Sequence, residues 1–579
     1  MINLNKFDNV YTVDFEYTGV GKLGESNGNR PIPVCCAVHE LHSGVTTRYW
    51  QEEIASTPPF DTGERSLFVG YSLTAEFSCF HVLGWPCPAN VLDLFAETML
   101  LYNGVMVDGE PVRGRPFNLV RALALWGLPA LDAGEKQSWI ETILRGAPWT
   151  DAERKGILDY CERDVQAETR LLNTMAEHID EQTYGVRGAY QYALAGQIHR
   201  GIPMDVEALN RVRSQWEQVR NKLIDSYAGQ YPFFSNYHFV EKKFAEWVNT
   251  LDIVWPTTPS GKFARDKDTL EALVDVYPSL NSFRELMSEA YASRELQLLV
   301  GDDGRNRCHL YPFGSKTSRN QPSSTKFVYG GRWWRSLIRP PEGYALAYLD
   351  FEQEEFAIAA YLSKDPAMIH DYEAGDPYLG MGKSVGLIPK DGTKASHPLE
   401  RNMCKTLNLA ILYGMGAESL SHKLKCSEDR AQEILDRLKE VYHVYFAWSA
   451  SFVEEGRRVG WVGTPYGWRL LTTGQSTRSL QNFPMQARGA DILRVACILL
   501  EETRIEVVAP VHDAVLVQAK LDAFNEVTEQ SVKLMVKASE LVLGHPLRVE
   551  KGQEVLYPSN YVAEKGGDAM WQKIRGMLT

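Results

Sequence analysis

The sequence predicts a multi-domain protein of mixed α/β and α+β class. With 579 residues and a mass of 65.4 kDa, the chain exceeds the size of one compact hydrophobic core. Short β-rich runs alternate with turns from Val10 to about Leu92, whereas residues 185–299 show long helical patterns. Strand patterns return at 344–350 and 507–518, with a further helical block between them. We therefore expect an α/β unit, a helical arm, a sheet, a helical insertion and a return to the sheet.

The composition is that of an ordinary globular protein, with 44% hydrophobic and 23% charged residues. No apolar run is long enough to cross a bilayer, and the first residues lack the apolar region of a signal peptide, so we expect a cytoplasmic protein. The nine cysteines form no CxxC pair, which argues against a structural zinc site or a disulfide framework. The net charge of −13 does not exclude a nucleic-acid partner, because DNA is bound by local basic surfaces.

Acidic residues near the N-terminus form a first candidate site. Asp14 and Glu16 lie two residues apart on a predicted strand and so share one face. Glu76 lies at the start of a predicted helix, and Tyr160 and Asp164 are spaced i, i+4 on another. An isolated pair of acids with this spacing would more often lie on a solvent-exposed strand face than in a metal site. Four converging acids with a tyrosine instead favour a two-metal hydrolytic site, in which the phenol orients the attacking water.

A second candidate site combines two aspartates that are distant in the sequence. The apolar strand YALAYLD ends in Asp350, and alternation along the strand presents this single carboxylate at its tip. Asp513 follows His512 in the predicted hairpin VVAPVHDAVLVQ. An aspartate in an apolar hairpin is costly unless it is hydrated, paired or bound to a metal. Either motif alone is a weak signal, since such dipeptides are common by chance.

The segment RNMCKTLNLAILYGMG strengthens this second site. Four of its residues recur every four positions and lie along one helical face: Arg401, Lys405, Leu409 and Tyr413. Two cations followed by two bulky side chains suit a nucleoside triphosphate, with the phosphates at the basic end and the base and sugar at the other. The alternative is an amphipathic helix whose basic end is only solvated.

Taken together, these segments resemble motifs A, B and C of family A DNA polymerases, the bacterial polymerase I group. The TSR segment at 317–319, the helix QNFPMQARGADILR and the PYGWR turn are similar to further segments of that family. The N-terminal acids resemble the tyrosine-bearing form of the DEDD exonucleases. The resemblance implies an RNase H-like 3′→5′ exonuclease domain followed by a right-hand polymerase.

The resemblance also implies roles for individual residues. Asp350 and Asp513 would hold two Mg²⁺ ions, with Mn²⁺ as a substitute, and Lys405 would also protonate the pyrophosphate. Asp14, Glu16, Glu76 and Asp164 would hold the metals of the exonuclease, and Tyr160 would act with them. The residues implied to bind the dNTP are Arg401, Lys405, Leu409, Tyr413, Glu355 and Gln353, with Glu355 and Tyr413 excluding a 2′-OH. The residues implied to bind DNA are Arg319, Arg469, Asn482, Gln486 and His512.

Several positions depart from the family pattern. The middle exonuclease motif, usually close to HNxxFD, is represented by Tyr71, Ser72 and Glu76, which leaves the strength of proofreading open. Leu409 stands where Phe or Tyr is usual, and Ala514 follows the VHD segment where Glu is common. These changes suggest a phage enzyme acting in the host bacterial cytoplasm. Some phage members copy DNA that contains 2-aminoadenine, and this chain is a candidate for that branch. Because Asp14 lies so near the start, we expect no 5′-nuclease domain.

The predicted function is replicative, template-directed DNA synthesis from dNTPs, with proofreading. The predicted partners are primer-template DNA and other replisome proteins. The predicted domains are an exonuclease (1–184), a thumb (185–300), a palm (301–370 and 485–579) and fingers (371–484). Single-subunit RNA polymerases share related motifs, but Glu355 leaves no room for the 2′-OH of a ribonucleotide. A DNA-binding accessory protein with inactive sites is a third reading, against which the retained acids argue.

Overall fold

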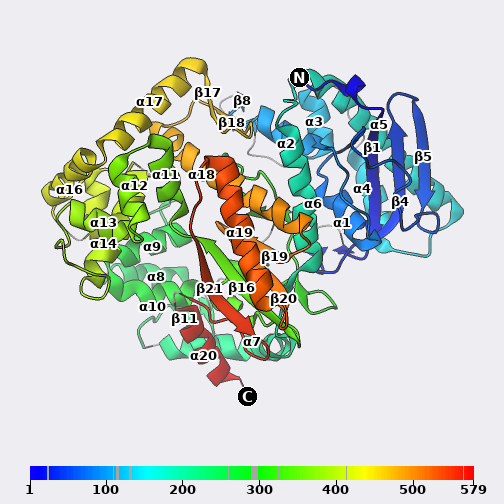
Figure 1. Cartoon of the computed structure of the whole chain (residues 1–579). Helices are drawn as coiled ribbons and strands as arrows, with labels where there is room; N and C mark the ends of the chain where they lie inside the picture. Colours follow the sequence, from blue (N-terminus) through cyan, green and yellow to red (C-terminus); the bar gives the residue numbers. More distant parts are fainter. Residues whose placement is uncertain are drawn as a thin grey trace.

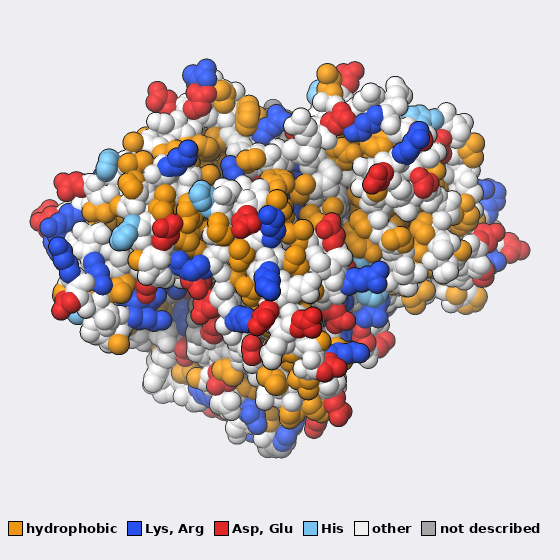
Figure 2. Space-filling view, viewed as in Figure 1, with side chains coloured by type: hydrophobic (Ala, Val, Ile, Leu, Met, Phe, Trp, Pro, Cys, Tyr) orange, Lys and Arg blue, Asp and Glu red, His pale blue; other side chains and the backbone are white. Residues whose placement is uncertain are grey.

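The computed structural model describes residues 1–22, 25–107, 110–112, 117–129, 133–227, 229–258, 260–288, 296, 298–323, 326–412, 414–424, 426–564 and 566–578. Figure 1 shows the N-terminal unit on the right, a central sheet, and a helical lobe on the left. Within these residues no helix is both long and apolar enough to span a membrane. On the face in Figure 2, basic and acidic side chains are interspersed.

The N-terminal unit is built on a mixed sheet, which has five strands among the described residues, in the order β5-β4-β1-β6-β7. Strand β1 pairs antiparallel with β4 and parallel with β6. The strands are β1 (Asn9–Thr18), β4 (Ile32–Glu40), β5 (Val45–Trp50), β6 (Ser66–Gly70) and β7 (Val91–Asp93). All residues of β6 are buried, because this strand lies inside the sheet and is covered by helices. Two short hairpins, β2–β3 (Gly21–Lys22, Glu25–Ser26) and β8–β9 (Met106–Val107, Glu110–Pro111), lie outside the sheet.

Helices pack around this sheet and bring acidic residues to it. The long helix α5 (Asp151–Met175) contacts β1 and β4, and a capping box of Thr150 and Glu153 starts it. The other helices of the unit are α1 (Thr74–Leu83), α2 (Leu94–Leu101), α3 (Leu119–Leu125) and α4 (Ala133–Arg145). Helix α4 contacts both α5 and β1.

Helix α6 (Tyr184–Arg200) joins the N-terminal unit to the rest of the protein. It contacts α1 and β7 on one side and α18 and β19 on the other. Gly188 allows the close approach to β7, because a Cβ there would overlap the backbone of Val91. The Arg187 guanidinium forms a buried ion pair with Glu97 of α2 and also donates to the carbonyl of Tyr466 (2.9 Å). The two halves of the chain therefore share polar as well as apolar contacts.

The central sheet carries the second group of predicted site residues. Its strands follow the order β19-β20-β16-β21, and every neighbouring pair is antiparallel. They are β16 (Tyr344–Phe351), β19 (Glu506–Val511), β20 (Ala514–Lys520) and β21 (Val549–Leu556). Helices α18 (Thr477–Glu502) and α19 (Phe524–Leu543) pack against each other beside this sheet (Figure 1). Helix α18 begins at Thr477, where Ser476 caps it by accepting the Ser479 N–H.

The helical lobe is inserted between β16 and α18. It contains α11 (Glu354–Ser363), α12 (Pro366–Glu373), α13 (Pro377–Ser384), α14 (Pro398–Leu412), α15 (Ala417–Leu424), α16 (Glu428–Val441) and α17 (His443–Val459). A hairpin of β17 (Trp461–Gly463) and β18 (Arg469–Leu471) follows. It reaches back to the N-terminal unit, where Asn103 donates to the carbonyls of Lys316 (2.9 Å) and Arg469 (2.6 Å).

Residues 185–299, which we expected to form long helices, do so only in part. Helix α7 (Val206–Tyr227) is followed by a hairpin, β11 (Phe234–Ser235) and β12 (His238–Phe239), and by short helices α8 (Glu241–Val248), α9 (Lys267–Val276) and α10 (Asn281–Leu286). The difference has a physical cause: Phe233, Phe244 and Phe283 pack with neighbouring aromatic rings into a local core that favours a folded loop. Short pairs β10–β13 (Ile202–Pro203, Arg305–Asn306) and β14–β15 (Leu310–Tyr311, Gln321–Pro322) and the C-terminal α20 (Gly567–Met577) complete the fold.

The Arg187–Glu97 pair predicts a large stability effect. Both side chains are buried (3% and 1% exposed), so Arg187→Met would leave the Glu97 carboxylate without its partner, at a cost of about 3–5 kcal/mol. The midpoint of urea-induced unfolding should fall accordingly. Arg458→Met is the matched control, because its ion pair with Glu455 is exposed and should change stability by less than about 1 kcal/mol. A shift for Arg187→Met no larger than that of the control would contradict the assignment.

Two candidate active sites

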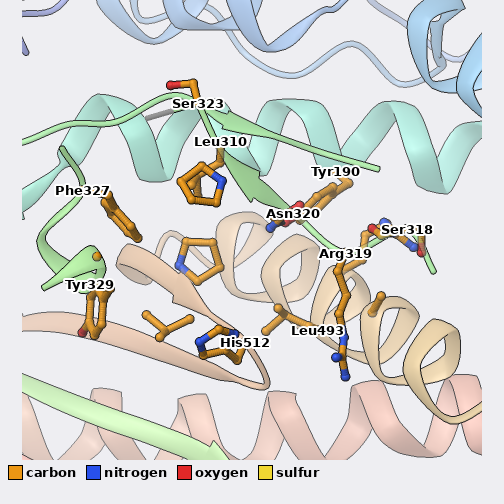
Figure 3. Close-up of a pocket in the computed structure, with 16 residues that line it drawn as sticks. Tyr190, Leu310, Ser318, Arg319, Asn320, Ser323, Phe327, Tyr329, Leu493 and His512 are labelled. Carbon is orange, nitrogen blue, oxygen red and sulfur yellow. Dashed lines mark hydrogen bonds between the residues drawn. The ribbon is translucent and has the colours of Figure 1, made fainter. Parts of the chain in front are cut away.

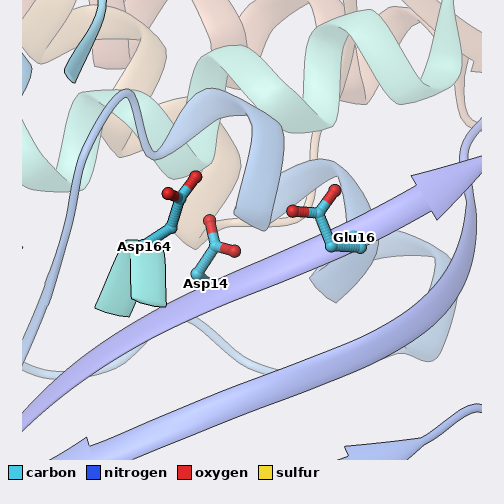
Figure 4. Close-up of side chains that lie close together, drawn as sticks. All are labelled: Asp14, Glu16 and Asp164. Atoms are coloured by element: carbon cyan, nitrogen blue, oxygen red, sulfur yellow. The ribbon is translucent and has the colours of Figure 1, made fainter. Parts of the chain in front are cut away.

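The first site is a cluster of carboxylates at the meeting point of β1 and α5. Asp14 and Glu16 project from β1, and Asp164 projects from α5 toward them (Figure 4). One carboxylate oxygen from each lies within 4.8 Å of the others. Burial and the neighbouring Asp164 raise the pKa of Asp14 to about 8. Such a group of acids is unfavourable without a cation among them.

Glu76 lies beside this group, although it does not belong to the tight trio. It is in the first turn of α1 and only 4% exposed, and one of its oxygens has no hydrogen-bond partner. Burial, followed by the charge of Asp14, raises its pKa well above the usual value. Tyr160 on α5 is also buried, and it lies one helical turn before Asp164. The structure thus brings together all five residues predicted for this site.

Sequence reasoning missed a fifth acid, Glu168. It lies on α5 one turn beyond Asp164, is 2% exposed, and accepts the backbone N–H of Tyr71 at 3.1 Å. Its second oxygen has no partner, and burial and the charge of Asp14 raise its pKa well above normal. The signal was present, because Tyr160, Asp164 and Glu168 recur every four residues on one face.

Asp93 is a further buried acid near Glu76, and its contacts give it a structural role. Its carboxylate accepts backbone N–H groups of Ser72 (3.0 Å), Leu73 (3.3 Å) and Phe95 (2.8 Å), and it is the N-cap of α2. The side chain of Gln191 donates to it as well. A carboxylate with this many donors is a structural cap that holds the Ser72 turn, whose φ is +66°.

The second site lies at one end of the central sheet. Asp350 is the penultimate residue of β16, and Asp513 lies in the two-residue turn between β19 and β20. The register pairs Asp350 with Ala514, and the Phe351 N–H donates to the Asp513 carbonyl (3.3 Å), so the two aspartates are neighbours. Burial, followed by the charge of Asp513, raises the pKa of Asp350 to about 7. Glu550 lies directly across from Asp350 on the other neighbouring strand, β21.

The residues after Asp350 form a polar group at the start of α11. Gln353 has a left-handed backbone (φ +46°), and its side-chain oxygen is buried without a hydrogen-bond partner. Glu355 forms an ion pair with Arg319 at 2.6 Å, which joins two of the residues predicted to contact nucleotide and primer. The intervening Glu354 is 2% exposed, and burial raises its pKa well above normal.

Helix α14 places the predicted triphosphate residues on the helical lobe. Lys405 is exposed, whereas Arg401 is half-buried and pairs with Asp376 at 2.5 Å. Sequence reasoning missed Asp376, which also caps α13. The Arg401 guanidinium lies 5.4 Å from the centre of the Tyr378 ring. Tyr413 and the side chain of Leu409 lie outside the described residues.

The residues predicted to contact DNA lie on several elements. His512 is exposed in the β19–β20 turn with φ +57°, and Asn482 and Gln486 lie on α18. Arg469 is exposed on β18, with its guanidinium 5.3 Å from the centre of the Trp461 ring. A cavity of about 490 Å³ opens beside His512 and Arg319 (Figure 3). Its largely apolar lining includes Tyr190 of α6, so the cavity lies between the sheet and the helix that leads to the N-terminal unit.

The chemistry of both sites fits divalent cations. Hard cations such as Mg²⁺ prefer carboxylate oxygens. Oxygens without a hydrogen-bond partner remain on Asp14, Asp164, Glu76 and Glu168 at the first site and on Asp350 at the second. Carboxylates held together with unused oxygens are therefore the ligand sets available to a metal at both places.

Comparison with known proteins identifies the class. Residues 257–554 match DNA polymerase family A, more than half of the chain. The chain belongs to DNA polymerase family A. The thermostable DNA polymerase I of Thermus aquaticus is 28% identical over 329 residues, which cover 52% of this chain and 39% of that protein. A DNA polymerase of Mycobacterium phage D29 is 26% identical over 252 residues, which cover 42% of this chain and 40% of that protein. The chain thus spans less than half the length of these relatives.

A solved structure supports the fold over nearly the whole chain. The POL domain of Pol1 from M. smegmatis, in complex with DNA primer-template and dNTP, superposes with a TM-score of 0.67 at 19% identity. The match covers 93% of this chain and 94% of that one. It confirms the predicted multi-domain α/β and α+β fold class.

Proposed function

We propose that this chain is a DNA-directed DNA polymerase that extends a primer along a template from dNTPs. The observation that carries the proposal is the pairing of Asp350 with the turn that holds Asp513, at one end of the central sheet. Two metal ions, Mg²⁺ in this proposal, would activate the primer 3′-OH and stabilise the charge of the leaving pyrophosphate. The protein's part is to hold Asp350 on β16 and Asp513 in the adjoining turn, where the antiparallel register of β16 and β20 fixes their separation.

The remaining residues bind and select the substrates in this proposal. Arg401 and Lys405 of α14 bind the triphosphate, and Lys405 donates a proton to the pyrophosphate. Glu355 excludes the 2′-OH, and its ion pair with Arg319 holds the carboxylate in one orientation. Gln353, Asn482 and Gln486 contact the new base pair and nearby DNA. His512 contacts the primer terminus, and Arg469 contacts a template phosphate.

We propose a second activity, 3′→5′ exonuclease, at the N-terminal acids. Asp14, Glu16 and Asp164 would hold the metals, with Glu76 as a further ligand, and the Tyr160 hydroxyl would orient the attacking water. Glu168 supports the Ser72 turn through Tyr71 and adds negative charge to the metal-binding region. The motif departures and the likeness to a phage polymerase support a phage-encoded, replicative enzyme. Membership of the 2-aminoadenine branch stays a prediction from the resemblance.

Removal of one ligand at the second site should abolish synthesis. Asp350→Asn or Asp513→Asn removes a negative charge from the metal ligands while keeping the side-chain shape and the DNA contacts. Primer extension should fall by far more than tenfold, whereas duplex binding, measured by fluorescence anisotropy, should stay nearly unchanged. Extension within about tenfold of wild type, or about 1.4 kcal/mol of barrier, would remove these residues from the catalytic role.

A control for this experiment changes the metal ligands of the N-terminal site. Asp14→Ala combined with Glu16→Ala should eliminate shortening of single-stranded 3′ ends and leave primer extension intact, because the two ligand sets lie on different sheets. Loss of both activities in this variant would show that the sites are not independent.

Sugar selection should depend on Glu355. Glu355→Ala opens the space that a 2′-OH would occupy and frees Arg319 from its ion pair. Incorporation of ribonucleotides relative to deoxyribonucleotides should rise by about tenfold or more, since a steric block is worth about 1–3 kcal/mol. Single-nucleotide insertion kinetics with dNTP and rNTP measure this ratio. Arg319→Met separates the two effects, because it breaks the ion pair but keeps the carboxylate; an equal rise in both variants would assign selection to Arg319 instead.

A further inference from the structure

The N-terminal carboxylate site contains a cation of its own that the proposed exonuclease mechanism does not use. The ammonium group of Lys136, on α4, donates to Asp164 at 2.5 Å. The same ammonium lies 5.4 Å from the centre of the Tyr160 ring. Lys136 therefore contacts two of the five residues predicted for this site.

The packing of α4 directs Lys136 to this place. Lys136, Trp139 and Ile143 are spaced i, i+3, i+7 and so share one face of the helix. Ile143 is buried with Ile157 and Tyr160 of α5, and Trp139 packs against the same cluster. Gly156 provides the space for the Trp139 ring, because a Cβ at that position would overlap it.

Electrostatic contacts tie the same helices together next to the site. Glu135, the neighbour of Lys136, forms an ion pair with Arg163 at 2.8 Å, and Arg163 immediately precedes Asp164. The side chain of Asp164 is 6% exposed, and its second oxygen has no hydrogen-bond partner. One oxygen of Asp164 is thus taken by Lys136 and the other is available.

We propose that Lys136 is the resident counter-ion of the N-terminal site and competes with the divalent cation for Asp164. Without metal, its ammonium offsets part of the repulsion among Asp14, Glu16 and Asp164. When a metal binds to these acids, the ammonium is a like charge nearby and opposes binding. Lys136 thereby sets the metal concentration at which the site fills. The inference rests on the proposed metal-dependent function of this site.

Metal binding, measured directly, tests this proposal. In the 579-residue chain with Asp350→Asn and Asp513→Asn, which silence the second site, bound Mn²⁺ is counted by electron paramagnetic resonance. Lys136→Met should lower the dissociation constant at the N-terminal site at least tenfold, equivalent to about 1.4 kcal/mol. Lys136→Arg keeps the charge and should remain near the wild-type value. Lys155→Met, which removes an exposed lysine paired with Asp159 on α5, is the control for a simple loss of charge and should have no effect.

Thermal unfolding provides a second readout. With a chelator present, Lys136→Met should unfold at a lower temperature than the parent protein, because Asp164 loses its partner. Saturating Mn²⁺ should raise the unfolding temperature of Lys136→Met by more than that of the parent, because the variant binds the ion more tightly. Retained primer extension by Lys136→Met with both palm aspartates intact would show that the variant is folded.

Unchanged or weaker Mn²⁺ binding by Lys136→Met would overturn the proposal. The outcome is distinguishable from failure of the proposed exonuclease. If the parent protein binds Mn²⁺ at Asp14 and Glu16 and the Lys136 variants bind equally, only the counter-ion role is wrong. If neither the parent nor Lys136→Met binds Mn²⁺ at these acids, the metal site itself is wrong, and the counter-ion role with it.

Discussion

Repulsion among carboxylates that the fold holds close together is the constraint on which the structure of both sites depends. Asp14 and Asp164 come from segments far apart in the sequence, and so do Asp350 and Asp513. Water would normally separate such charges, but here strands and a long helix fix their positions. Positive charge offsets this repulsion, and among the described residues Lys136 provides it at the first site and Arg319 near Asp513 at the second. The metal ions proposed for both sites would supply the rest of the positive charge.

The strand register determines where the carboxylate of Asp350 lies at the second site. Because Asp350 pairs with Ala514, its carboxylate is held next to the β19–β20 turn; a slip of one residue would turn it to the opposite face of the sheet. The first site depends on packing between elements instead, since β1, α1, α4 and α5 each contribute part of it. The N-terminal unit and the central sheet share one hydrophobic core, whose residues range from Ile2 through α6 to Leu547. The Asn103 and Arg187 contacts add polar ties across the same boundary.

The sequence predicted those parts of the fold in which a local pattern alone determines the geometry. The strand ending at Asp350, the hairpin around Asp513 and the helix carrying Tyr160 and Asp164 all appear as predicted, because alternation, turn chemistry and i, i+4 spacing act within a few residues. The helical arm was predicted poorly, because aromatic packing between distant positions overrode the helical pattern. Glu168 could have been found from its i, i+4 spacing after Asp164, whereas Lys136 and Asp376 could not. Their partners are set by how helices dock, and single-sequence periodicity does not report which helices meet.

The most direct measurement of the central claim is a primer-extension assay with the wild-type chain, a labelled primer, a longer template and Mg²⁺. With four dNTPs the account predicts extension to the end of the template, with four rNTPs little or no extension, and without nucleotides shortening of the primer from its 3′ end. A chelator should stop all of these reactions. Extension that is equally efficient with rNTPs, or no Mg²⁺-dependent extension with dNTPs, would contradict the account.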